Sequence, residues 1–223
     1  MNAFQALLTR DVRLSFRRGS EGMTGLVFFV IVASLFAIAF GGDPVQIKPL
    51  AGGIIWVSAL LAALLSLDSL YHRDYEDGTF DLLLQSPVSV VAVVAAKMMA
   101  HWLVSGLTFV MASLVVGSML FIPADVLPVL WVSMLLGTVY MSLIGGLGAI
   151  LTFGTRRPGL LVTLLILPLM VPMLILGVLA TDAALAAMAV KPYILLQLAL
   201  VVVALTAAPL MAAVILPMQV RST

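Results

Sequence analysis

Six long stretches without Asp, Glu, Lys or Arg constrain the fold of this chain more than any other feature of its sequence. Each is about 18–26 residues long, and about 20 helical residues cross the ~30 Å hydrocarbon core of a bilayer. Because no water in that core can hydrogen-bond the backbone, such stretches cross it as α-helices. The sequence therefore predicts an all-α membrane protein with six transmembrane helices, over residues 22–40, 50–67, 98–121, 128–153, 160–180 and 193–217.

The composition favours a single transmembrane domain over residues 1–223. Hydrophobic residues make up 63% of the chain and charged residues 9%, against about 45–50% and about 25% in soluble proteins. A soluble fold of this size could not cover that much apolar surface with polar side chains. The absence of cysteine excludes disulfides, thiolate metal sites and a Cys nucleophile. The net charge of +1 gives no sign of a nucleic-acid partner.

The distribution of basic residues predicts that both termini are cytoplasmic. With this orientation only Lys48 and Lys191 lie outside, in agreement with the positive-inside rule. The other nine of the 11 basic residues lie inside: Arg10, Arg13, Arg17, Arg18, Arg73, Lys97, Arg156, Arg157 and Arg221. Residues 37–39 (Ala-Ile-Ala) have the small-x-small form of a signal-peptide cleavage site. A cleavable signal peptide is therefore the alternative interpretation of the first stretch. We expect an uncleaved span, because the stretch is longer than the usual ~7–15 residues.

Residues 1–20 have the pattern of an amphipathic helix lying on the membrane surface. At 100° per residue, Arg10, Arg13 and Arg17 fall on one side of the helix, where they face anionic lipid headgroups. The alternative is a basic topology signal with no further role. The apolar side consists of Phe4, Leu7, Leu8, Val12, Leu14 and Phe16.

No ionisable residue lies near the middle of any predicted span. Asp68, Lys97 and His101 cluster at the inner ends of the second and third spans. Proton-coupled carriers need such groups at depth, so the pattern argues against one. Gly154 and Gly159 have P-loop spacing, but leucines occupy the Lys and Ser/Thr positions that hold phosphate and Mg²⁺. We therefore expect no catalytic residue and no metal site, and no nucleotide hydrolysis by this chain.

A polar cytoplasmic loop, residues 68–97, separates the second and third spans. Five of the ten acidic residues of the chain lie between positions 68 and 81. Gly78 and Thr79 favour a turn followed by a helix cap, which predicts a short helix over residues 79–85 that ends before Pro87. A solvated loop without a partner is the alternative. The predicted docking element for a cytoplasmic partner consists of Asp74, Glu76, Asp77, Gly78, Thr79, Phe80, Asp81, Leu82 and Leu83.

These residues resemble a known family. An acidic-Gly-Thr-hydrophobic-acidic-Leu-Leu pattern after the second of six spans is similar to the ABC-2 class of transporter permeases. Residues 52–60, 73–78, 96–102 and 167–169, with Pro172, resemble more closely the CcmB family, also called haem exporter protein B. The resemblance covers nearly the whole chain.

The resemblance implies a non-enzymatic permease subunit in the bacterial inner membrane. It implies work on haem for cytochrome c maturation, or release of a haem-loaded periplasmic chaperone, driven by ATP hydrolysis in a separate subunit. The implied partners are a CcmA-like ATP-binding cassette subunit, CcmC-like and CcmD-like haem-handling membrane subunits, and a CcmE-like chaperone reached through the complex. The residue pattern implies that residues 74–83 dock on the ATPase subunit. Neither ATP nor haem is expected to bind this chain directly.

Several residues leave alternatives open. His101 is expected to pack or to form interfacial hydrogen bonds, with loop-to-bundle signalling and haem ligation as lesser possibilities. Pro168 and Pro172 predict a hinge in the fifth span, whereas ordinary membrane-helix packing is the plain alternative. Gly145, Gly146 and Gly148 are expected to permit close helix contact.

Three rival functions remain compatible with the sequence. The first is an ABC-2 permease that exports a drug, lipid or polysaccharide. The second is a standalone carrier or channel, which would transport without ATP. The third is a purely structural membrane scaffold.

Overall fold

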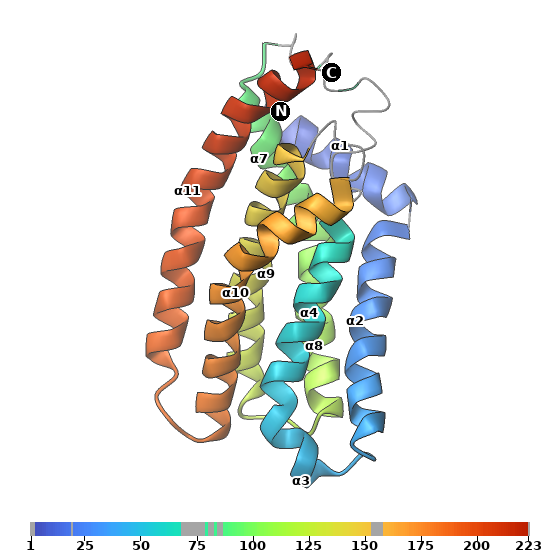
Figure 1. The fold of residues 1–223 in the computed structure, drawn as a ribbon, viewed down its shortest axis with the longest axis vertical. Coiled ribbons are helices and arrows are strands. Elements are labelled where there is room, and N and C mark those ends of the chain that lie inside the picture. Colours follow the sequence, from blue (N-terminus) through green and yellow to red (C-terminus); the bar gives the residue numbers. More distant parts are fainter. Residues whose placement is uncertain are drawn as a thin grey trace.

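The chain forms a bundle of long helices in a computed structural model, which describes residues 3–18, 20–67, 79, 83, 87–152 and 158–222 (Figure 1). Within these ranges every element of regular secondary structure is helical. The elements are α1 (Ala3–Arg18), α2 (Ser20–Ala39), α3 (Pro44–Ile47), the 3₁₀ helix η1 (Lys48–Leu50), α4 (Ala51–Leu67), α7 (Val90–His101), the π-helix η2 (Trp102–Gly106), α8 (Leu107–Met119), α9 (Leu127–Leu151), α10 (Pro158–Leu185) and α11 (Lys191–Ser222).

Six helical segments run along the bundle, as the sequence predicts. Five are long and apolar enough to cross a membrane: Pro44–Leu67, Val90–Met119, Leu127–Leu151, Leu164–Leu185 and Lys191–Gln219. The sixth is the shorter apolar stretch Met23–Ala39 within α2. The prediction of an all-helical, multi-pass membrane protein is thus confirmed.

Both termini lie at one end of the bundle (Figure 1). We call this the inner end; α4 and α9 finish there, α7 begins there, and α1 lies across it. The connections α2–α3, α8–α9 and α10–α11 lie at the outer end. Lys48 and Lys191 belong to the outer end and α1, with its arginines, to the inner one, which is the charge asymmetry that the positive-inside rule requires.

The third span begins earlier than predicted. The sequence placed the end of the cytoplasmic loop at residue 97, because Lys97 is charged, but α7 already begins at Val90. Ser89 caps it, with its Oγ accepting a hydrogen bond from Ala92 N at 3.3 Å. Lys97 therefore lies two turns inside a helix, where it is 4% exposed.

Glycines let large side chains of neighbouring helices enter the core. Trp56 of α4 is fully buried, and its ring occupies the places that a Cβ at Gly137 of α9 or Gly177 of α10 would take. The predicted close contacts are confirmed at Gly145, which receives Leu67, and at Gly148, which receives Ile166 of α10. The role of Trp56 was not predicted, because its partners are far away in the sequence.

Helix α10 bends within the bundle. Pro168 and Pro172 lie inside it and are exposed, and Figure 1 shows its first part running across the bundle before the rest turns along it. A proline removes one backbone hydrogen bond and disturbs the preceding turn. The Tyr140 hydroxyl of α9 donates to the Leu169 carbonyl at 2.9 Å, so a neighbouring helix is bonded to the backbone of α10 between the two prolines.

The contact between Trp56 and the two glycines gives a first prediction. Gly177→Ala and Gly137→Ala each place a methyl group inside the Trp56 ring position, and such overpacking costs about 1–3 kcal/mol. We expect a lower midpoint of thermal unfolding in detergent, followed by tryptophan fluorescence.

Gly53→Ala is the matched control, because nothing lies within 4 Å of its Cβ position. In a helix this change stabilises by roughly 0.5–1 kcal/mol. Equal stability of the variants at Gly177 and Gly53 would contradict the assigned packing of Trp56.

Candidate functional site

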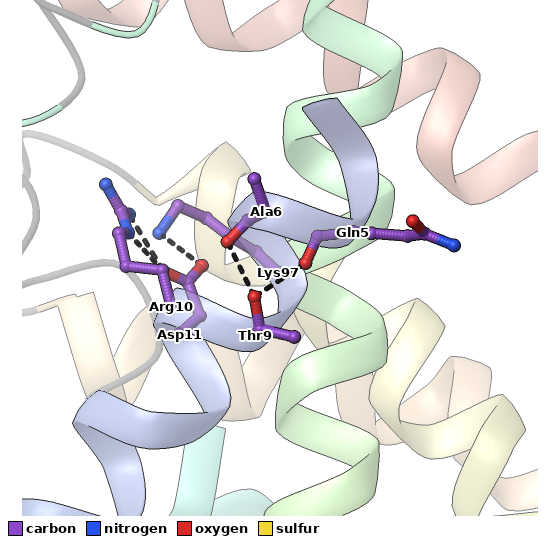
Figure 2. A network of polar contacts seen from close by, with 6 residues as sticks. All are labelled: Gln5, Ala6, Thr9, Arg10, Asp11 and Lys97. Atoms are coloured by element: carbon purple, nitrogen blue, oxygen red, sulfur yellow. Dashed lines mark hydrogen bonds and ion pairs between the residues drawn. The ribbon is translucent and has the colours of Figure 1, made fainter. Parts of the chain in front are cut away.

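A buried ion-pair network joins the surface helix α1 to the span that starts with α7. Figure 2 shows the Asp11 carboxylate between Arg10 and Lys97. Lys97 Nζ lies 3.2 Å from Asp11 Oδ2, and Arg10 Nε donates to Asp11 Oδ1 at 2.8 Å. Thr9 Oγ1 donates to the carbonyls of Gln5 and Ala6, one turn earlier in the same helix. The Thr9 hydroxyl is thus satisfied by the backbone of α1.

Burial makes this network costly to break. The side chains of Lys97 and Asp11 are 4% and 12% exposed, whereas that of Arg10 is 37% exposed. Two cations therefore share one carboxylate at the inner end. Desolvated charges of this kind are retained only when they are paired. The pair holds α1 against α7, which explains how Lys97 can lie inside a hydrophobic helix.

Asp11, the carboxylate of this network, was not predicted from the sequence. It follows Phe4, Leu7 and Leu8 at i+7, i+4 and i+3 on the apolar side of α1, and this acidic residue on an apolar face was the available signal. Phe4, Leu7 and Leu8 are half-buried, because α1 packs against α7 and α2. The predicted amphipathic helix at the inner end thus faces the bundle with its apolar side.

His101 forms a second polar junction at the inner end. Its Nε2 lies 3.1 Å from Ser66 Oγ of α4, and its Nδ1 lies 3.2 Å from Ser142 Oγ of α9. One imidazole therefore connects three helices. Both ring nitrogens are engaged, so the arrangement agrees with the expected hydrogen-bonding role and leaves neither nitrogen free for a metal.

A π-helix follows His101 directly. Residues Trp102–Gly106 form η2, and the Trp102 indole N–H donates to Thr138 Oγ1 of α9 at 3.2 Å. Single π turns within α-helices are frequent at functional sites. Here the wider turn lies one residue beyond the junction that ties α7 to α4 and α9.

The predicted docking element is described only at Thr79 and Leu83. Both residues are helical and half-buried, in agreement with a helix over 79–85, and Leu83 packs against the buried core. Docking on a partner stays a prediction. The remaining docking residues lie outside the described part of the chain: Asp74, Glu76, Asp77, Gly78, Phe80, Asp81 and Leu82.

A cavity of ≈ 380 Å³ lies on the side of α7 away from Lys97. Apart from the Ser142 hydroxyl and the Trp102 indole its lining is apolar, so it suits an apolar group. Among the described residues, no three His, Cys, Asp or Glu come together as metal ligands. The lining residues come from α1, α7, η2, α9 and α11: Phe4, Ala95, Met98, Met99, Trp102, Val139, Ser142, Leu143, Val201, Leu205 and Pro209.

Long apolar helices, connected so that both termini lie at one end, define a multi-pass helical membrane protein. The chain belongs to the CcmB protein family, whose family model matches residues 2–219. The family resemblance stated from the sequence is therefore confirmed.

Three curated relatives are similar to this chain over 78–98% of its length. The chain is 46% identical over 208 residues to a Pseudomonas aeruginosa protein named heme exporter protein B, which covers 93% of each chain. A Paracoccus denitrificans protein of the same name is 46% identical over 173 residues, covering 78% of this chain and 79% of its own. The Escherichia coli K12 protein of that name is 36% identical over 218 residues, covering 98% and 99%.

The network in Figure 2 gives a second prediction. Asp11→Asn removes the carboxylate that faces Lys97 and Arg10, and breaking a buried ion pair in this way costs about 3–5 kcal/mol. We expect a clear loss of thermal stability in detergent and less protein in the membrane fraction, measured by immunoblot.

The exposed Arg13 of the same helix provides the control, and Arg13→Gln should change stability by less than about 0.5 kcal/mol. Exchanging the charges, Asp11→Lys with Lys97→Asp, should recover part of the loss. If the Asn variant is as stable as the parent, the pair does not hold α1 in place.

Proposed function

We propose that the chain is the membrane permease subunit of an ABC-type complex for cytochrome c maturation. In this proposal a separate subunit hydrolyses ATP, and the permease couples that hydrolysis to haem handling or to release of the haem-loaded periplasmic chaperone. The chain itself carries out no chemical reaction. The observation that carries the proposal is membership of the CcmB family over residues 2–219, together with relatives named heme exporter protein B.

The geometry of the inner end supports this role. The acidic segment connects α4 to α7 at the end where α1 and both termini lie. A rigid contact is needed to pass a push from a cytoplasmic subunit into the bundle. Leu83, which packs against the core and follows Asp81 by two positions in the sequence, would provide such a contact.

Two junctions can carry the push further. Ser66 lies at the end of α4 and bonds His101 of α7, which in turn bonds Ser142 of α9. The Lys97–Asp11 pair connects α7 to α1. A displacement of the 74–83 segment therefore acts on α4 and α7 together, and through them on α9 and α1.

The proposed partners are a CcmA-like ATP-binding cassette subunit on the cytoplasmic side and CcmC-like and CcmD-like subunits in the membrane. A CcmE-like chaperone is reached through the complex on the periplasmic side. The proposed location is the bacterial inner membrane. ATP and haem are handled by partners, so no cofactor is assigned to this chain.

Charge reversal in the acidic segment tests the docking. We expect Asp77→Lys with Asp81→Lys to reduce co-purification of the ATPase subunit at least about tenfold, the effect of losing ~1.4 kcal/mol of binding free energy. The measurement is affinity purification in mild detergent, followed by quantitative mass spectrometry and an ATPase assay.

Asp43→Lys with Asp125→Lys is the matched control, because both residues flank the connections of the outer end; co-purification should be unchanged. Retained ATPase subunit in the first variant would reject residues 74–83 as the docking element. An ATPase partner without haem-binding subunits would favour export of another substrate, and transport by the purified chain alone would favour a carrier.

The engagement of His101 leads to a separate prediction. Since Ser66 and Ser142 occupy both ring nitrogens, we expect His101→Gln to leave the haem content of the purified complex unchanged, measured as the pyridine haemochrome. The stability of the variant should fall by about 1 kcal/mol for each hydrogen bond lost. Loss of stoichiometric haem, without loss of any subunit, would instead identify His101 as an iron ligand.

A further inference from the structure

The contact between α4 and the outer half of α10, which we call the α4–α10 seam, contains buried polar atoms without partners. Trp56 Nε1 and Asp182 Oδ1 are both buried and find no hydrogen-bond partner among the described residues. Leaving such a group unpaired costs about 1–3 kcal/mol. The closed seam is thus less favourable than its close packing suggests.

The two helices approach each other closely along this seam. A Cβ at Gly52 of α4 would lie 2.7 Å from Asp182 Oδ1 and 3.3 Å from Thr181 Cβ, both on α10. One turn further along α4, Trp56 takes the place of a Cβ at Gly177. Thr181 is 0% exposed and its hydroxyl is satisfied within α10 by the Gly177 carbonyl at 2.9 Å. Within the described part of the chain, the side chains of Trp56, Thr181 and Asp182 form no hydrogen bond or ion pair across the seam.

The inner parts of the same helices are fixed much more firmly. At the inner end of α4, Ser66 is bonded to His101, and Leu67 fills the notch at Gly145. The inner part of α10 is held by Ile166 against Gly148 and by the Tyr140–Leu169 hydrogen bond. Both attachments of α10 are to α9, and both lie before or between its two prolines.

A hinge therefore separates the fixed part of α10 from the part that lines the seam. Pro168 and Pro172 interrupt the backbone hydrogen bonds of α10, and α10 bends in this region (Figure 1). Residues 173–185 follow the hinge and contain Gly177, Thr181 and Asp182. When this part moves away from α4, water reaches the Asp182 carboxylate and the Trp56 indole, so the cost of the two unpaired groups is removed.

We infer that residues 173–185 of α10 form a gate that opens at the outer end by swinging away from Trp56 of α4 about the hinge at Pro168 and Pro172. The gate deepens the proposed function. Its driving force, the ATPase cycle, rests on that proposal, whereas the opening motion of α10 does not. In the closed state the Trp56 ring blocks the seam. In the open state the outer side gains a water-accessible path between α4 and α10 that starts at Asp182.

The absence of cysteine from the chain allows a direct test with single cysteines. Thr181→Cys reports on the seam, and Ser133→Cys is the matched control, because both residues are hydroxyl-bearing and 0% exposed. Ser133 belongs to the α9–α11 contact, where it is bonded to Gln197 at 2.9 Å. The complex carrying each variant is treated in intact spheroplasts with a membrane-impermeant maleimide.

We expect Thr181→Cys to react at least about tenfold faster than Ser133→Cys, the ratio given by a ~1.4 kcal/mol difference in opening free energy. ATP turnover should increase the first rate and leave the second unchanged. Equal rates with and without ATP, in a complex that retains its ATPase subunit, would overturn the gate while the proposed function stands. Faster labelling at position 181 in a chain that binds no ATPase subunit would support the gate and reject the proposed function.

A disulfide provides the second measurement. The Cβ positions of Gly52 and Thr181 lie 3.3 Å apart, close to the ~3.5–4.5 Å of natural disulfides, so Gly52→Cys with Thr181→Cys should close the seam covalently. We expect the cross-linked complex to keep its ATPase subunit but to lose cytochrome c maturation, with each single variant active. Full maturation by the cross-linked form would overturn the gate.

Discussion

A polar group at membrane depth must form its hydrogen bonds or ion pairs within the protein. The arrangement of the helices in this bundle depends on where these partners lie. Except at the prolines inside α10 and α11, the backbone of each long segment can be satisfied within its own helix. Lys97 lies inside α7 because Asp11 of α1 approaches it at 3.2 Å, and the half-buried His101 lies between Ser66 and Ser142. Each of these pairs joins neighbouring helices whose apolar contacts gain nothing from the hydrophobic effect in lipid. The polar pairs therefore decide which helices stay together.

These pairs are concentrated at the inner end, where the proposed ATPase subunit would act. Asp11, Lys97, Ser66, His101 and Ser142 connect α1, α4, α7 and α9 into one unit. Among the described residues, the outer half of α10 has no comparable polar connection to α4, and Trp56 and Asp182 carry unpaired atoms there. This difference between the α4–α10 seam and the inner end is the basis of the proposed gate. A permease that receives its energy at one face and does its work at the other needs a firm part and a movable part.

Glycines set the distances on which this arrangement rests. Gly137 and Gly177 make room for the largest side chain of the core, Trp56, and Gly145 and Gly148 do the same for Leu67 and Ile166. The exposed Pro168 and Pro172 bend α10 without entering these contacts. Close packing and bending are thus carried by different residues, as the proposed hinge in α10 requires.

The sequence by itself determined the helical spans, their orientation, the amphipathic first helix and the family, because hydropathy and charge act locally along the chain and residues 52–60 and 73–78 are distinctive. It also predicted the close contacts at Gly145 and Gly148, whereas the hinge at Pro168 and Pro172 stays a prediction. The start of α7, the burial of Lys97 and the importance of Asp11 and Trp56 were decided only by the tertiary structure. In each case the physical reason is the same: the partner of the residue is brought near it only by packing, so the local sequence carries no sign of it. For Lys97 this partner is a carboxylate 86 positions away. For Trp56 it is a pair of glycines on two other helices.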